Sequence, residues 1–129
     1  MTLLAALLGT LGSVNDCSKG TAIFKITSMS LRPDPPVIGQ NSTLDISMLV
    51  PYDILSGTAI YSSTYNFIPL APTVEDLCAN VVCPIQTGTL NTISSIPFDG
   101  SLKGSITLKI EWKDATNNEL MCVSVNVKV

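Results

Sequence analysis

The chain has 129 residues, which is room for one domain with a single core. It contains no histidine, the residue that most often serves as general base, proton shuttle or metal ligand, so the composition argues against an enzyme. Charged residues make up 13% and the net charge is -3, which excludes the basic surface that nucleic acid binding needs, whereas 46% of residues are hydrophobic and indicate a large core or an apolar cavity.

The amino-terminal segment Met1 to Gly12 (MTLLAALLGTLG) is an apolar run followed by small residues. This pattern predicts a signal peptide over residues 1–13, with Thr10 and Gly12 at the cleavage site, and a domain over residues 14–129. The run is too short to span a bilayer. The alternative interpretation is a buried amino-terminal strand.

Alternation of apolar and polar residues predicts β-strands along most of the chain. In Thr43–Val50 the apolar face carries Ile46 and Met48. In Ser105–Lys113 it carries Ile106, Leu108, Ile110 and Trp112. The expected strands, in chain order, are Ala22–Leu31, Thr43–Val50, Thr58–Phe67, Leu90–Phe98, Ser105–Lys113 and Glu119–Val129.

Strong breakers separate these segments, notably the proline-rich Arg32–Gln40, Pro69–Pro72 and Asp99-Gly100. Thr73–Cys78 is expected to form one short helical turn. Six or seven short strands with such turns predict an all-β fold, an immunoglobulin-like antiparallel β-sandwich.

The four cysteines, an even count behind a predicted leader, indicate two disulfides with three possible connectivities. Cys78 and Cys83 are close enough to close a small loop, which leaves Cys17 with Cys122. A four-cysteine zinc site is the alternative, but the spacing lacks paired metal-binding knuckles, so we expect no metal. The sequon at Asn41 predicts glycosylation, and together these features place the protein outside the cell or in a lysosomal or vacuolar lumen.

Three motifs resemble the ML lipid-recognition domain family, and most closely its lysosomal sterol carrier, over residues 16–129. Asp16-Cys17-Ser18 is similar to the family's opening motif. Cys78 to Gln86, which ends in Cys-Pro-Ile-Gln, is similar to its cysteine-loop signature, and Ser105–Lys113 followed by Leu120-Met121-Cys122 is similar to its closing strands.

The resemblance implies the same two disulfides and a sandwich with an apolar gap between its sheets, in which family members bind sterols, phospholipids, glycolipids or acyl chains. It also implies that Phe67 and Phe98 lie at the mouth of this gap. Apolar inner faces would line it, because water fills such a void poorly and a lipid fills it well. The expected lining residues are Ile46, Met48, Ile106, Leu108, Ile110 and Trp112.

The function expected from these features is binding and transfer of a sterol or phospholipid, without a catalytic residue or a cofactor. Transfer implies transient contact with a membrane or a receptor. Two alternatives remain open: a recognition module that presents lipid, and a purely structural module of an extracellular assembly.

Overall fold

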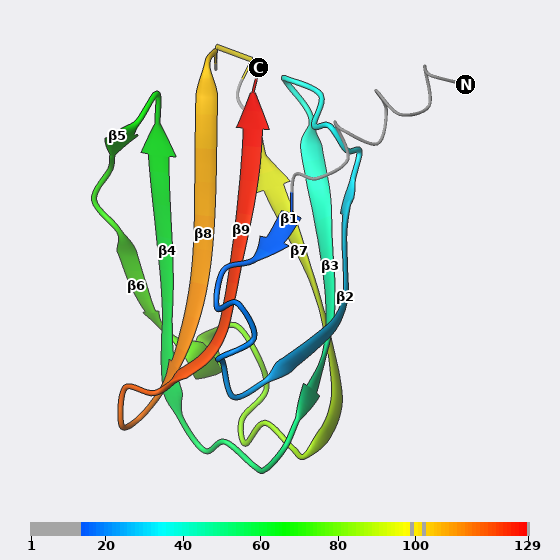
Figure 1. The fold of residues 1–129 in the computed structure, drawn as a ribbon, viewed down its shortest axis with the longest axis vertical. Coiled ribbons are helices and arrows are strands. Elements are labelled where there is room, and N and C mark those ends of the chain that lie inside the picture. Colours follow the sequence, from blue (N-terminus) through cyan, green and yellow to red (C-terminus); the bar gives the residue numbers. More distant parts are fainter. Residues whose placement is uncertain (1–13, 99, 102, 129) are drawn as a thin grey trace.

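The computed structural model describes residues 14–98, 100–101 and 103–128, and these form two facing antiparallel sheets (Figure 1). The first sheet has the order β1-β9-β8-β4-β5, with β6 also paired to β4, and the second has the order β2-β3-β7. This confirms the expected all-β, immunoglobulin-like sandwich. Within the described residues the strands are β1 (Val14–Asp16), β2 (Lys25–Arg32), β3 (Asn41–Val50), β4 (Gly57–Tyr65), β5 (Ile68–Pro69), β6 (Thr73–Asp76), β7 (Gly88–Pro97), β8 (Ser105–Asp114) and β9 (Glu119–Lys128).

The alternating sequence explains the long strands. In β3, Leu44, Ile46, Met48 and Val50 are buried, and the residues between them lie on the outer face. Successive strand side chains point to opposite faces, so one apolar stripe from each sheet meets the other in the core. Most of the favourable folding energy comes from removing these stripes from water.

Two details of the predicted secondary structure were wrong. The described residues form three short strands beyond the six predicted, β1, β5 and β6, which sequence alternation did not reveal because two to four residues are too few to show it. The expected helical turn over Thr73–Cys78 is instead strand β6, and the helical turn is a 3₁₀ turn at Leu77–Ala79. Pairing of Thr58 with Asp76 and of Tyr61 with Thr73 extends the first sheet and overrides the local turn preference.

Both expected disulfides form, which makes the zinc alternative wrong because each of the four sulfur atoms is bonded to another. Cys17 is joined to Cys122 on β9, and Cys78 to Cys83. The segment after Cys17 is hydrogen-bonded along β9, with Ile23 N donating to Glu119 O at 3.0 Å and Phe24 N donating to Leu120 O at 2.8 Å. The disulfide and these hydrogen bonds join the two sheets on the side of β1 and β2.

The two sheets are not joined in this way on the side where β7 and β4 face one another. Among the described residues, no backbone hydrogen bond joins β7 to β4, β5 or β6. The two sheets are therefore free to separate there, and this is where the cavity lies.

The predicted leader, residues 1–13, lies outside the described residues. Within the part of the chain that the structure describes, no helix has the length and apolar character needed to cross a membrane.

Candidate functional site

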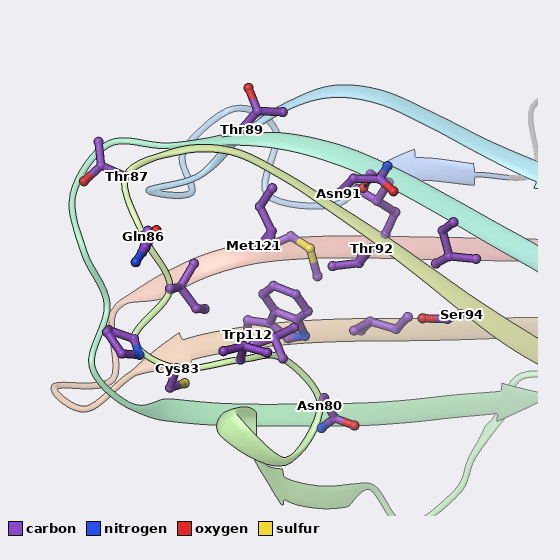
Figure 2. Close-up of a pocket in the computed structure, with 18 of the residues that line it drawn as sticks. Asn80, Cys83, Gln86, Thr87, Thr89, Asn91, Thr92, Ser94, Trp112 and Met121 are labelled. Atoms are coloured by element: carbon purple, nitrogen blue, oxygen red, sulfur yellow. Dashed lines mark hydrogen bonds between the residues drawn. The ribbon is translucent and has the colours of Figure 1, made fainter.

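A cavity of about 850 Å³ lies between the sheets on the open side of the sandwich (Figure 2). Its wall is formed by residues of β3, β4, β8 and β9, by residues 89–94 of β7, and by residues 80–87. The volume falls within the range of about 300–1,000 Å³ that is typical of sites for small organic ligands. The cavity is thus large enough for one such molecule.

The buried part of the cavity is apolar, and we call it the floor. Figure 2 shows Trp112 and Met121 at the centre of the floor, beneath β7. The indole of Trp112 packs edge-on against Phe24, with ring centroids 6.5 Å apart, and its buried Nε1 has no hydrogen-bond partner among the described residues. Packing therefore holds the ring in place. The floor consists of Ile46, Leu90, Ile110, Trp112 and Met121.

The exposed part of the cavity is mainly polar, and we call it the rim. Its polar side chains are amides and hydroxyls, with the exposed apolar residues Val82, Pro84 and Ile93 among them. Among the described residues, no lysine, arginine, aspartate or glutamate lines the cavity. Such groups can donate to or accept from a polar ligand group without neutralising a charge. The polar rim residues are Asn80, Gln86, Thr87, Thr89, Asn91 and Ser94, all of them exposed. Thr89 and Asn91 lie on the outer face of β7, where Asn91 Nδ2 donates to Asp45 Oδ1 at 2.7 Å.

Residues 77–87, the Cys loop, form one end of the cavity and are fixed at several points. Leu77 is fully buried and anchors the 3₁₀ turn. The backbones of Ile54 and Ile85 exchange hydrogen bonds of 2.9 and 2.7 Å. Together with the Cys78–Cys83 disulfide, these contacts hold the loop against the sandwich.

The Asp53 carboxylate adds another fixed point at the rim. Its Oδ1 accepts from the backbone N and from Oγ1 of Thr87, both at 2.8 Å. The backbone hydrogen bond first, and the hydroxyl second, lower the pKa of Asp53 below its ordinary value. The contact is therefore intact at neutral pH and is lost only as the pH falls through this lowered pKa.

Three of the residues predicted to line the gap do line it: Ile46, Ile110 and Trp112. Met48 and Ile106 are buried elsewhere in the core, and Leu108 packs against it. The structure does not bring these other residues to the cavity, and their part in lipid binding stays a prediction.

The two aromatic residues predicted at the mouth lie elsewhere. Phe67 is 85% exposed in the turn between β4 and β5. Phe98 is buried, and its backbone exchanges hydrogen bonds with Gly39 and Gln40. Neither residue lines the cavity, because both follow the ends of strands remote from the Cys loop.

The sequence interpretation missed the rim and part of the floor. Tyr61 lines the cavity, and its pKa is raised by burial and then by the nearby Glu75. The rim residues on β7 are polar, so they gave no core signal. Their positions in the sequence were the signal that could have identified them. Gln86 belongs to the Cys-Pro-Ile-Gln element, and Thr92 shares the inward face of β7 with Leu90.

One group of potential metal ligands lies apart from the cavity. Oxygen atoms of Glu111 and Glu119 and the sulfur of Cys122 lie within 4.8 Å of one another. Cys122 is bonded to Cys17 and offers no thiolate, so the group reduces to two carboxylates. It gives no support for a metal site.

Comparison with protein families identifies a match to the ML domain over residues 12–129. A Dictyostelium discoideum protein, provisionally named phosphatidylglycerol/phosphatidylinositol transfer protein 1, is 29% identical over 120 residues, which is 89% of this chain and 79% of that protein. The phosphatidylglycerol/phosphatidylinositol transfer protein of Pyricularia oryzae is 29% identical over 113 residues, which is 82% of this chain and 64% of that protein.

Two solved structures share the fold. The Niemann-Pick type C2 protein of the Japanese carpenter ant has a TM-score of 0.67 at 15% identity, covering 88% of this chain and 96% of its own. Chicken MD-1, solved with lipid IVa, has a TM-score of 0.65 at 15% identity, covering 89% of this chain and 86% of its own.

Proposed function

Since the chain belongs to the ML-domain family, we propose that it binds one lipid in the cavity between its sheets and transfers it between membranes. The observation that carries this proposal is the amphipathic cavity, with a buried apolar floor and an exposed polar rim. An acyl tail on the floor is stabilised by about 0.8 kcal/mol per buried methylene group. The protein acts by binding, without a catalytic step.

Two observations favour a phospholipid over a sterol. The rim offers many hydrogen-bonding groups, more than a single sterol hydroxyl can use, and they suit a headgroup with several hydroxyls. The relatives from Dictyostelium and Pyricularia are named for phosphatidylglycerol and phosphatidylinositol, whose headgroups have this character. Because no cation lines the cavity, the phosphate stays at the rim in contact with water.

The turn at Asn66 and Phe67 is the surface through which we propose that the protein contacts a membrane. Both residues have left-handed backbone conformations, with φ of 50° and 68°. Such a conformation costs about 1–3 kcal/mol per non-glycine residue, and the Phe67 ring recovers nothing by burial. Asn66 fixes the turn, since its backbone N donates to Ser105 O at 2.7 Å and its Oδ1 accepts from Ser105 N at 2.9 Å.

The side chains around Phe67 suit the surface of an anionic bilayer. Ile68 and Leu70 are 63% and 52% exposed and continue the apolar surface. The exposed Lys103, whose backbone N donates to the Tyr65 hydroxyl at 3.2 Å, supplies a positive charge beside it. Aromatic and aliphatic groups beside a lysine are typical of proteins that insert shallowly into the interface.

We propose that the protein is secreted or resides in a lysosomal or vacuolar lumen, because its two disulfides are stable in oxidising compartments. Asn41 of the sequon is exposed at the start of β3, which is consistent with glycosylation.

A vesicle assay tests the transfer function and the membrane contact separately. The protein is expected to move labelled phosphatidylglycerol or phosphatidylinositol from donor to acceptor vesicles. Phe67→Ser is expected to slow transfer roughly tenfold, because it removes one inserting aromatic side chain. Tyr52→Ser is the matched control. Tyr52 is 51% exposed and follows β3 at the end of the sandwich opposite to Phe67, so this variant should transfer phospholipid at the native rate.

The outcomes separate the two claims. If the unaltered protein moves no phospholipid, the transfer function is wrong. If it transfers phospholipid and Phe67→Ser does so equally fast, the membrane contact is wrong and the transfer function stands.

A further inference from the structure

Three of the four outer edges of the two sheets are protected against pairing with another strand. In the first sheet, β1 has three residues, and the opposite edge consists of the short β5 and β6, with Pro69 ending β5 and Pro72 directly before β6. In the second sheet, β2 has an irregular register between Ile26 and Ser28 and carries Lys25 and Arg32 at its ends. Short strands, prolines, irregularities and charges all hinder edge-to-edge association.

The fourth edge, β7, has one of these devices only at its end, where Pro97 is the last residue of the strand. It is ten residues long and pairs with β3 without interruption, from Asn41 opposite Pro97 to Val50 opposite Gly88. Residues 88–96 (GTLNTISSI) contain no charged residue and no proline. Among the described residues, no strand pairs with its outer side. Ile93 is 65% exposed on the outer face of the sheet, at the border of the cavity. A long, regular, uncharged edge of this kind is a template for another strand.

We propose that β7 pairs antiparallel with β7 of a second copy of this chain, which makes a two-fold dimer with one continuous six-stranded sheet. Identical strands pair around a two-fold axis, so one residue lies opposite itself. With Ile93 on the axis, Thr92 faces Ser94, Asn91 faces Ser95, and Leu90 faces Ile96.

This register matches like with like on both faces of the sheet. The outer face brings the two Ile93 side chains together, between pairs of asparagine and serine. The inner face sets Leu90 against Ile96, and both of these pack against the core of their own copy. Cross-strand apolar and hydrogen-bonding pairs stabilise a sheet, and β7 has no charge to repel its counterpart. This self-complementarity is the reason to assign the edge to a second copy.

Single cysteine substitutions test both the dimer and its register. Within the described residues every native cysteine is in a disulfide, so a new thiol can pair only with its counterpart. Residues opposite each other on antiparallel strands have Cα atoms about 4.5–5.5 Å apart, within the disulfide range of about 4.4–6.8 Å. Ile93→Cys is therefore expected to form a covalent dimer under mild oxidation. Ser95→Cys is the control, because its two copies would lie about 13 Å apart along the strands and should stay uncrosslinked.

Light scattering of the purified protein gives the second measurement. The protein is expected to be a dimer, and Ile93→Lys a monomer of native fold, because two ammonium groups would meet on the axis. Leu49→Lys, at an exposed position on the same face of β3, should remain a dimer. A monomeric native protein, or equal crosslinking of Ile93→Cys and Ser95→Cys, would overturn the proposal. Neither measurement requires bound lipid, so the result is independent of the transfer function.

Discussion

Replacing Thr92 with phenylalanine is expected to weaken phospholipid binding roughly ten- to hundredfold while leaving the fold intact. Thr92 lies opposite Ile46 on the inward face of β7 and lines the cavity (Figure 2). A phenyl ring at this position occupies space that the acyl tail would otherwise fill. The tail then loses burial comparable to that of one large apolar side chain, about 1.5–3 kcal/mol.

Trp112 provides the measurement for this variant. It is the chain's one tryptophan and lies on the cavity floor, so a phospholipid brominated on its acyl chain should quench its fluorescence on binding. Thr107→Phe is the matched control, because Thr107 is also half-buried but faces outward from strand β8. Equal binding by Thr92→Phe and by the native protein would show that the lipid binds elsewhere.

Removing the Cys17–Cys122 disulfide is expected to lower the free energy of unfolding by about 4–5 kcal/mol. The bridge joins residues 105 apart, and in the chain-entropy model it restricts the unfolded chain by about 4.7 kcal/mol. Total stabilities of single domains are about 5–15 kcal/mol, so the double variant Cys17→Ala/Cys122→Ala should be close to unfolding at 37 °C. Denaturant titration of the oxidised native protein and of this variant measures the difference.

The second disulfide is the control for that experiment. Cys78 and Cys83 are five residues apart, so the same model gives only about 2 kcal/mol for their bridge. Removing this disulfide should reduce the free energy of lipid binding more than the free energy of unfolding, because the Cys loop forms one end of the cavity. Equal losses of stability from the two double variants would contradict the chain-entropy explanation.

Sequence alone predicted the fold because its long strands alternate clearly. Ser105–Lys113 shows this best, and it forms β8 with one added residue. The strands that escaped prediction depend on tertiary pairing: β6 forms because β4 offers it an edge. The disulfides were predictable because Cys78 and Cys83 are close in the sequence, and once they are paired only Cys17 and Cys122 remain.

The candidate site was only partly predictable because alternation identifies an inward face without locating a void. Ile110 and Ile106 share one face of β8, yet only Ile110 lines the cavity, since the sheets separate at that end of the strand. Phe67 shows the opposite failure. The family resemblance implied a place at the pocket mouth, but tight turn geometry holds its ring in solvent.

The central claim is that the cavity holds one phospholipid, and mass spectrometry of the protein purified from its own cells tests this most directly. The purified protein is extracted with organic solvent, and the lipid content is compared with the amount of protein. We expect close to one phospholipid per chain in the native protein, and a strongly reduced amount in Thr92→Phe purified in parallel. A protein that carries no lipid, and that takes up neither phospholipid nor sterol afterwards, would contradict it.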